Sequence, residues 1–238
     1  METLFFSALI IFAGAMVLGL SGFGGALFSM PLLVLFVDPK WAAPVVVLCY
    51  TINRIPALFA LRRNLMWNHS LLLIAAAAPG AFLGTYFLKS LEPAIIMKIL
   101  GTLLILYAAY KLCAPAVKLH FSLFWAIPTG FLSGLLGGAF GTDGPPVVVY
   151  AALKPWSKEQ VIGMLHSFFL VAHLLIIGSY AYHGLLNASV LTASGISAPF
   201  AVAGFFLGLK INRRIRQRHF EVILSCMIGV MGFLLWTR

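Results

Sequence analysis

The chain has 238 residues, of which 62% are hydrophobic and only 9% are charged. Such a composition lies outside the usual range of water-soluble globular domains and predicts an integral membrane protein built from helices. The formal net charge of +10 is typical of basic cytoplasmic loops that face anionic lipid, so nucleic-acid binding is a poor explanation for it.

Six apolar stretches are each long enough to cross about 30 Å of hydrocarbon as a single helix. They are residues 42–61, 70–88, 93–113, 160–182, 187–209 and 220–236. The segment that precedes them lacks the basic region of a signal peptide, so we interpret it as a retained first helix. The connections are short, and we therefore expect one membrane domain over residues 1–238.

Two longer apolar stretches, 3–37 and 121–153, would each measure about 50 Å as one helix. Glycine-rich sequence interrupts both, as "GLSGFGG" at 19–25 and "FLSGLLGGAFGTDG" at 131–144. We expect a full helix followed by a short one in each stretch. The short segments, 25–37 and 145–153, either cross the membrane or re-enter it, and treating each long stretch as one broken span leaves eight crossings instead of ten segments.

The two halves of the chain match one another in order. The matching features are "LSG" at 20–22 and at 132–134, and Pro79 with Gly84 against Pro199 with Gly204. This predicts two repeats, about 3–113 and about 121–237, and an odd number of segments in each repeat inverts the second relative to the first. The predicted fold class is an all-α polytopic membrane protein with two inverted repeats of about five helical segments, eight to ten in total.

The glycine-rich breaks predict a polar site, because backbone released from a helix at membrane depth must face protein or a wet cavity. A short helix that begins there presents its amides and the positive end of its dipole, which favours an oxyanion. The candidate substrate-binding residues at the breaks are Ser21, Gly22, Phe23, Gly24 and Gly25, and then Ser133, Gly137, Gly138, Gly141, Thr142 and Gly144.

Arg54 is the candidate charged ligand of this site. It lies eight residues before Arg62, about 12 Å along a helix and too far to reach that interface comfortably. A buried cation needs a partner, which could be a substrate anion, Asp143 or a carbonyl left free by Pro56. The guanidinium fork suits a tetrahedral oxyanion, and neighbouring Asn53 could add a neutral donor.

Asp143 has three interpretations. With Thr142 it could cap the amides of the short helix whose first turn holds Pro145; as a desolvated carboxyl it could carry a proton; or it could simply be exposed in a loop. His166 and His173 are seven residues apart and lie on one helix face, either as hydrogen-bonded packing residues or as a proton relay. We keep Asp143, His166 and His173 as candidates for proton coupling.

The three cysteines have no metal-ligand spacing, so we expect neither a metal site nor a cofactor. They are Cys49, Cys113 and Cys226.

Four segments together resemble the TauE/SafE family, the sulfite exporter family of membrane permeases. They are "LSGFGGALFSMPLLVLFVDPKWAAPVVV", "GFLSGLLGGAFGTDGPPVVVYAALKP", "PGAFLGTYFL" and "PFAVAGFFLG". The resemblance implies transport of small sulfur-containing anions, such as sulfite or organosulfonates, across a bacterial inner membrane, with the site between the two breaks. Thr142 and Asp143 depart from the more usual all-glycine pattern, which leaves the exact anion and proton coupling open.

The leading hypothesis is therefore a secondary transporter and not an enzyme, with a small anion, the lipid bilayer and a coupling proton or ion as partners and a homodimer as the candidate assembly. A passive anion channel would use the same amides without alternating access. "GLSG" at 19–22 also matches the pattern of rhomboid-type intramembrane proteases, with His166 or His173 as the base. A protease, however, has no need of a duplicated chain.

Overall fold

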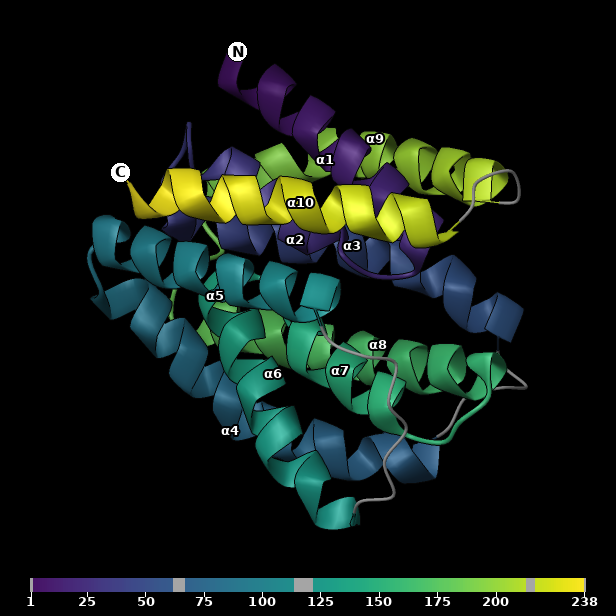
Figure 1. Cartoon of the computed structure of the whole chain (residues 1–238). Helices are drawn as coiled ribbons and strands as arrows, with labels where there is room; N and C mark the ends of the chain where they lie inside the picture. The colour runs from purple at the N-terminus through teal and green to yellow at the C-terminus, as the bar shows by residue number, and fades with distance from the viewer. Residues whose placement is uncertain (1, 62–66, 114–121, 213–216, 238) are drawn as a thin grey trace. The chain divides into compact units, whose positions relative to one another are not determined.

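The computed structural model describes residues 2–61, 67–113, 122–212 and 217–237 (Figure 1). These residues form ten α-helices and one short 3-10 turn, with no strand among them. The first five helices are α1 (Glu2–Ser21), α2 (Gly25–Leu33), α3 (Pro39–Leu61), α4 (Trp67–Ser90) and α5 (Pro93–Cys113). The turn η1 (Leu123–Trp125) precedes α6 (Ala126–Phe140), α7 (Gly144–Leu153), α8 (Lys158–Tyr182), α9 (Ala188–Asn212) and α10 (Gln217–Trp236). The predicted all-α class is confirmed.

Six helical segments of the described chain are long and apolar enough to cross a membrane, which supports a multi-pass membrane protein. They are Thr3–Ser21, Ser70–Ser90, Pro93–Cys113, Leu123–Phe140, Gln160–Tyr182 and Ala188–Asn212. Four of them contain predicted crossings almost residue for residue. The predicted crossings 42–61 and 220–236 lie within α3 and α10, and the second is apolar over a shorter length.

Both long apolar stretches divide into a long helix and a short one, as expected. The first contains α1 and α2, and the second contains α6 and α7. The short helices have nine and ten residues, about 15 Å of helix, which is half the hydrocarbon thickness. Each sequence half therefore supplies five helices, while the inverted orientation of the two repeats and their limits, 3–113 and 121–237, stay a prediction.

The chain folds into two compact units, and each takes helices from both sequence halves. Unit 1 contains Met1–Tyr50, Ser90–Pro115 and Leu186–Arg238, and unit 2 contains Thr51–Lys89 and Ala116–Leu185. The units therefore differ from the two predicted repeats. Helix α3 contributes to both, since its first half lies in unit 1 and its second half in unit 2.

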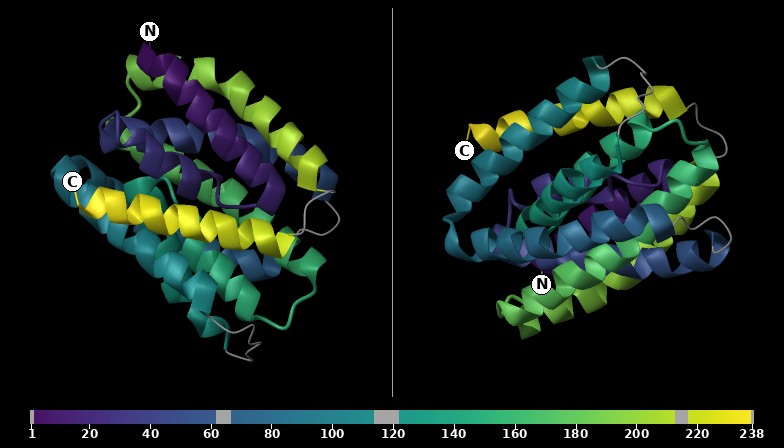
Figure 2. Two further views of the ribbon diagram at one scale, coloured as in Figure 1. Left: turned by 45° about the horizontal axis from the view of Figure 1, so that its top comes forward. Right: turned by 90° about the horizontal axis from the view of Figure 1, so that it is seen from below.

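Small residues allow the long helices inside each unit to approach closely. In unit 1, α9 runs beside α1 (Figure 2), and Gly204 and Gly208 face backbone carbonyls of α1 so closely that a Cβ would collide with them. In unit 2, Gly80 and Gly84 of α4 meet carbonyls of α6 in the same way. Close backbone contact of this kind is typical of helices packed in a membrane.

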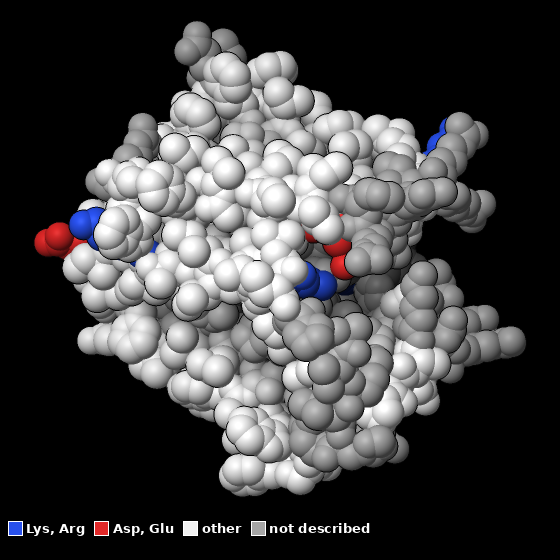
Figure 3. Space-filling model, viewed as in Figure 1, with Lys and Arg blue, Asp and Glu red and all other residues white. Residues whose placement is uncertain are grey.

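Large apolar side chains cover much of the exterior. Phe36, Phe124 and Tyr182 are each more than two-thirds exposed, and charged groups are sparse on the face shown in Figure 3. Because lipid is as apolar as these side chains, such a surface is expected for helices that face hydrocarbon.

Candidate functional site

The break in unit 2 places a carboxyl group inside the protein. Helix α6 ends at Phe140, and Gly141 turns the chain in the left-handed conformation, at φ 65°. Helix α7 then begins at Gly144. Thr142 and Asp143, between the two helices, are only 3% and 4% exposed. The interpretation of Asp143 as an exposed loop residue is therefore wrong.

The interpretation of Asp143 as a helix cap is wrong too. Asp143 occupies the N-cap position of α7, but its side chain makes no capping hydrogen bond. A capping carboxylate accepts from the amide of the second or third helical residue, and here these residues are Pro145 and Pro146, which have no amide hydrogen. The carboxyl group of Asp143 is thus directed to other partners.

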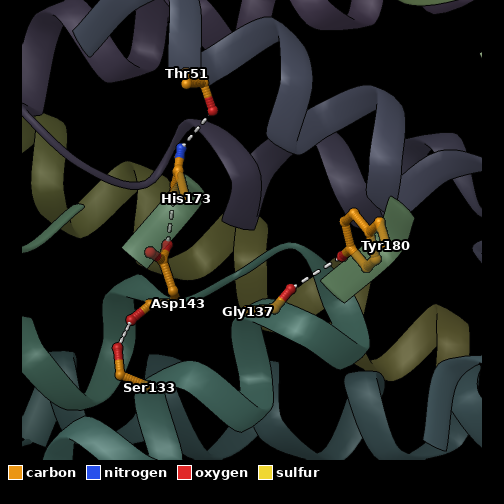
Figure 4. Close-up of polar contacts among 6 residues, drawn as sticks. All are labelled: Thr51, Ser133, Gly137, Asp143, His173 and Tyr180. Atoms are coloured by element: carbon orange, nitrogen blue, oxygen red, sulfur yellow. Dashed lines mark hydrogen bonds and ion pairs between the residues drawn. The ribbon is translucent and has the colours of Figure 1, made fainter. Parts of the chain in front are cut away.

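The side chain of Asp143 pairs with His173 of α8. The His173 Nε2 atom lies 3.4 Å from Oδ1 of Asp143, with both side chains almost fully buried. The backbone is fixed at the same point, because the hydroxyl of Ser133 donates to the carbonyl of Asp143. Figure 4 shows Asp143 between Ser133 and His173. Asp143 can lie this close to α6 because residue 137 is glycine: a Cβ on Gly137 would lie 2.9 Å from Cβ of Asp143.

His173 has a second partner on the opposite side of its ring. Its Nδ1 atom is 3.0 Å from the hydroxyl oxygen of Thr51 in α3 (Figure 4). A threonine hydroxyl can donate to a neutral ring nitrogen or accept from a protonated one. The contact therefore suits both charge states of His173, and the sequence pattern had not indicated Thr51.

Arg54 lies one helical turn after Thr51 and is buried, with 6% of its surface exposed. Its guanidinium carbon is 4.5 Å from the centre of the Phe169 ring of α8. It also interacts electrostatically with Asp143 and with His166. The neighbouring Asn53 is 1% exposed. Arg54 is thus buried as expected, and Asp143, one of the three partners that the sequence left open, interacts with it.

Two polar atoms near this cluster have no hydrogen-bond partner within the described part of the chain. They are Oδ2 of Asp143 and Nδ1 of His166. Buried polar atoms normally have a partner, and one without a protein partner indicates a place for water, an ion or a ligand. Nearby, the Tyr180 hydroxyl donates to the carbonyl of Gly137 at 3.1 Å (Figure 4) and holds the last turn of α6.

The break in unit 1 is built differently. Gly22 and Gly24 have φ values of 77° and 88°, and the Ser21 hydroxyl lies within hydrogen-bond reach of the carbonyls of Val17 and Phe23. Helix α2 then begins at Gly25, and no side chain caps its amides.

The Phe23 ring, at the tip of this break, lies 5.3 Å from Nζ of Lys111. Lys111 in turn pairs with Glu221 of α10 at 3.7 Å. We call this set of three side chains the Phe23 clasp.

The candidate residues thus fall into two groups. Unit 1 contains Ser21, Gly22, Phe23, Gly24 and Gly25, and unit 2 contains Asn53, Arg54, Ser133, Gly137, Gly138, Gly141, Thr142, Asp143, Gly144, His166 and His173. Gly138 faces a carbonyl of α4 and serves helix packing. That both breaks surround one anion stays a prediction. Among the described residues, no three His, Cys, Asp or Glu side chains gather as metal ligands.

Comparison with known proteins places the chain in a family. The chain is 27% identical over 241 residues to a "probable membrane transporter protein" of Methanocaldococcus jannaschii, which covers 90% of this chain and 88% of that protein. No solved structure matches the chain. The family described as "Sulfite exporter TauE/SafE" matches residues 6–235. Because this range is nearly the whole sequence, the chain belongs to the TauE/SafE family.

Proposed function

We propose that this membrane transporter carries small sulfur-containing oxyanions, such as sulfite or organosulfonates, across the bacterial inner membrane by alternating access. The family description supports the substrate class, and the name of the archaeal relative supports the transporter class. Membership in a transporter family also sets aside the intramembrane protease that "GLSG" had suggested. Helices broken near the middle of a membrane are typical of secondary transporters.

The observation that carries the proposal is the buried guanidinium of Arg54. It lies over the Phe169 ring, 4.5 Å from the ring centre, which restricts where the guanidinium fork can lie. Arginine in such a setting recognises planar or tetrahedral oxyanions through paired hydrogen bonds. We propose that the substrate anion binds to this fork.

Neutral donors complete the proposed site. Asn53 and Thr142 are buried in the same unit, and α7 begins at Gly144, shortly after Thr142, with the positive end of its dipole. Only Gly144 and Val147 carry amide hydrogens in the first four positions of α7, because the two residues between them are prolines. The charge of Arg54 must therefore supply more of the anion affinity here than the helix start does.

The proposal is tested by a thermal-shift screen of the purified protein against sulfite, sulfate, thiosulfate, ethanesulfonate, taurine and acetate. A ligand that binds the folded state raises Tm. We expect a rise with sulfur oxyanions and none with acetate. Calorimetry on Arg54→Ala should then show affinity lowered at least about tenfold, because hydrogen bonds to a charged group are lost.

Two variants keep this test interpretable. Arg54→Lys retains the charge but not the fork, and should recover part of the affinity. Lys98→Ala removes an exposed cation of unit 1 and should bind as the unaltered protein does. Unchanged affinity in a folded Arg54→Ala protein would overturn the assignment, and ohmic currents in place of saturable counterflow would make the protein a channel.

A further inference from the structure

Asp143 is a negative charge close to the proposed anion site, and anion binding at Arg54 would remove its counter-ion. Arg54 and Asp143 are both buried and interact electrostatically, so with a neutral His173 this interior carries no net charge. An anion that binds Arg54 would leave one uncompensated negative charge in a medium of low dielectric constant, which is costly. A proton taken up together with the anion would remove that charge.

We propose that the Asp143–His173 pair is a proton-binding site, and that one proton enters it from solution each time an anion binds Arg54. The inference rests on the proposed function, since it names the coupling ion of that same site. In the empty state Arg54 is the counter-ion of Asp143. In the loaded state the anion takes Arg54, and protonated His173 becomes the counter-ion of Asp143. One monoanion and one proton enter together, so the interior keeps its charge.

The contacts of His173 fit this exchange. Its Nε2 is already at ion-pair distance from Asp143, 3.4 Å, so the protonated ring would find its counter-ion without moving far. Its Nδ1 faces the Thr51 hydroxyl at 3.0 Å, which accepts from the protonated ring as readily as it donates to the neutral one. The second oxygen of Asp143, Oδ2, has no partner in the described residues and is the other place where the proton could reside within the pair.

The remaining titratable groups around Asp143 lie on the helices packed against α7. Helix α8 contributes Tyr180 and His166 besides His173, and Tyr180 interacts electrostatically with Asp143. Helix α6 has no titratable side chain, and α7 itself has only Tyr150. Among these groups, His166 is the competing acceptor, because it interacts with Arg54.

The experiment is calorimetry with ethanesulfonate, a monoanion, so that one proton restores the charge of the interior. Ethanesulfonate does not change its own charge near neutral pH, so any proton taken up must go to the protein. Titrations in buffers of different ionisation enthalpy give the number of protons taken up per anion. We expect about one for the unaltered protein, with an affinity that rises about tenfold for each unit by which the pH falls.

The variants separate the alternatives. Asp143→Asn should bind the anion with proton uptake near zero and an affinity independent of pH, whereas Asp38→Asn, which alters an exposed carboxylate of unit 1, should keep both. Binding without proton uptake in the unaltered protein would overturn this inference and leave the proposed function standing. Loss of uptake in His166→Gln with retention in Asp143→Asn would also overturn it. Failure of ethanesulfonate to bind at any pH, with no thermal shift from any sulfur oxyanion of the screen, would overturn the proposed function itself.

Discussion

The two helix breaks both contain a left-handed glycine but differ in their chemistry. The break in unit 1 has no ionisable residue from Ser21 to Gly25, and all four residues of the first turn of α2, from Gly25, carry an amide hydrogen. The break in unit 2 holds Asp143, and prolines occupy two of the four corresponding positions in α7. One break thus offers backbone donors, while the other is surrounded by ionisable side chains.

This difference shows how a repeated feature can serve two purposes. A left-handed glycine ends or precedes a helix in both units, so this turn residue is common to both breaks. The side chains of α3 and α8 then supply Thr51, Arg54 and His173 to the second break alone. Charge and proton chemistry would therefore belong to unit 2, whichever anion is carried.

The largest effect on the break in unit 2 is expected from a substitution at Gly137. In Gly137→Ala the new Cβ would lie 2.9 Å from Cβ of Asp143 and would also crowd the Ile176 side chain. We expect the variant to lose about 1–3 kcal/mol of stability, and anion affinity to fall with it, because Asp143 must move.

Thermal unfolding of Gly137→Ala, compared with that of Gly178→Ala, measures the loss of stability. Gly178 lies in α8, and no atom comes within 4 Å of the position that a Cβ would take there. Alanine at this position should therefore be neutral or stabilising by up to about 1 kcal/mol. Equal Tm values for the two variants would show that the close approach of α6 to Asp143 is not needed.

A smaller effect is expected at the Phe23 clasp. Lys111→Met removes the cation above the Phe23 ring and the partner of Glu221. Because the Lys111–Glu221 pair is partly exposed, the loss should be about 0.5–1 kcal/mol. Proton uptake per anion should stay as in the unaltered protein, and a change in that number would show that unit 1 also takes part in proton coupling.

Much of the fold could be predicted from the sequence because membrane helices are recognisable by their length and apolarity. The division of 3–37 and 121–153 into long and short helices followed from their glycines. The two compact units could not be predicted, because the placement of α4 in unit 2 and of α9 and α10 in unit 1 depends on which helix faces meet. Small residues such as Gly80 and Gly204 mark those faces, but they do not identify the partner helix.

The candidate site was predictable in part. Arg54 and Asp143 stood out as ionisable residues in apolar surroundings. The cap interpretation of Asp143 was wrong, because the second and third residues of α7 are prolines and have no amide hydrogen to offer. Thr51 and Phe169 could not be found, because a threonine and a phenylalanine in membrane helices are ordinary packing residues. Only the fold shows that they hold His173 and Arg54.

The most direct test of the account is a crystal structure with bound selenate, a tetrahedral oxyanion whose selenium can be located by anomalous scattering. We predict a selenium peak in unit 2, within hydrogen-bonding reach of the Arg54 guanidinium and absent from Arg54→Ala crystals grown in the same way. A peak confined to the amides of α2 in unit 1, with none beside Arg54, would contradict the account.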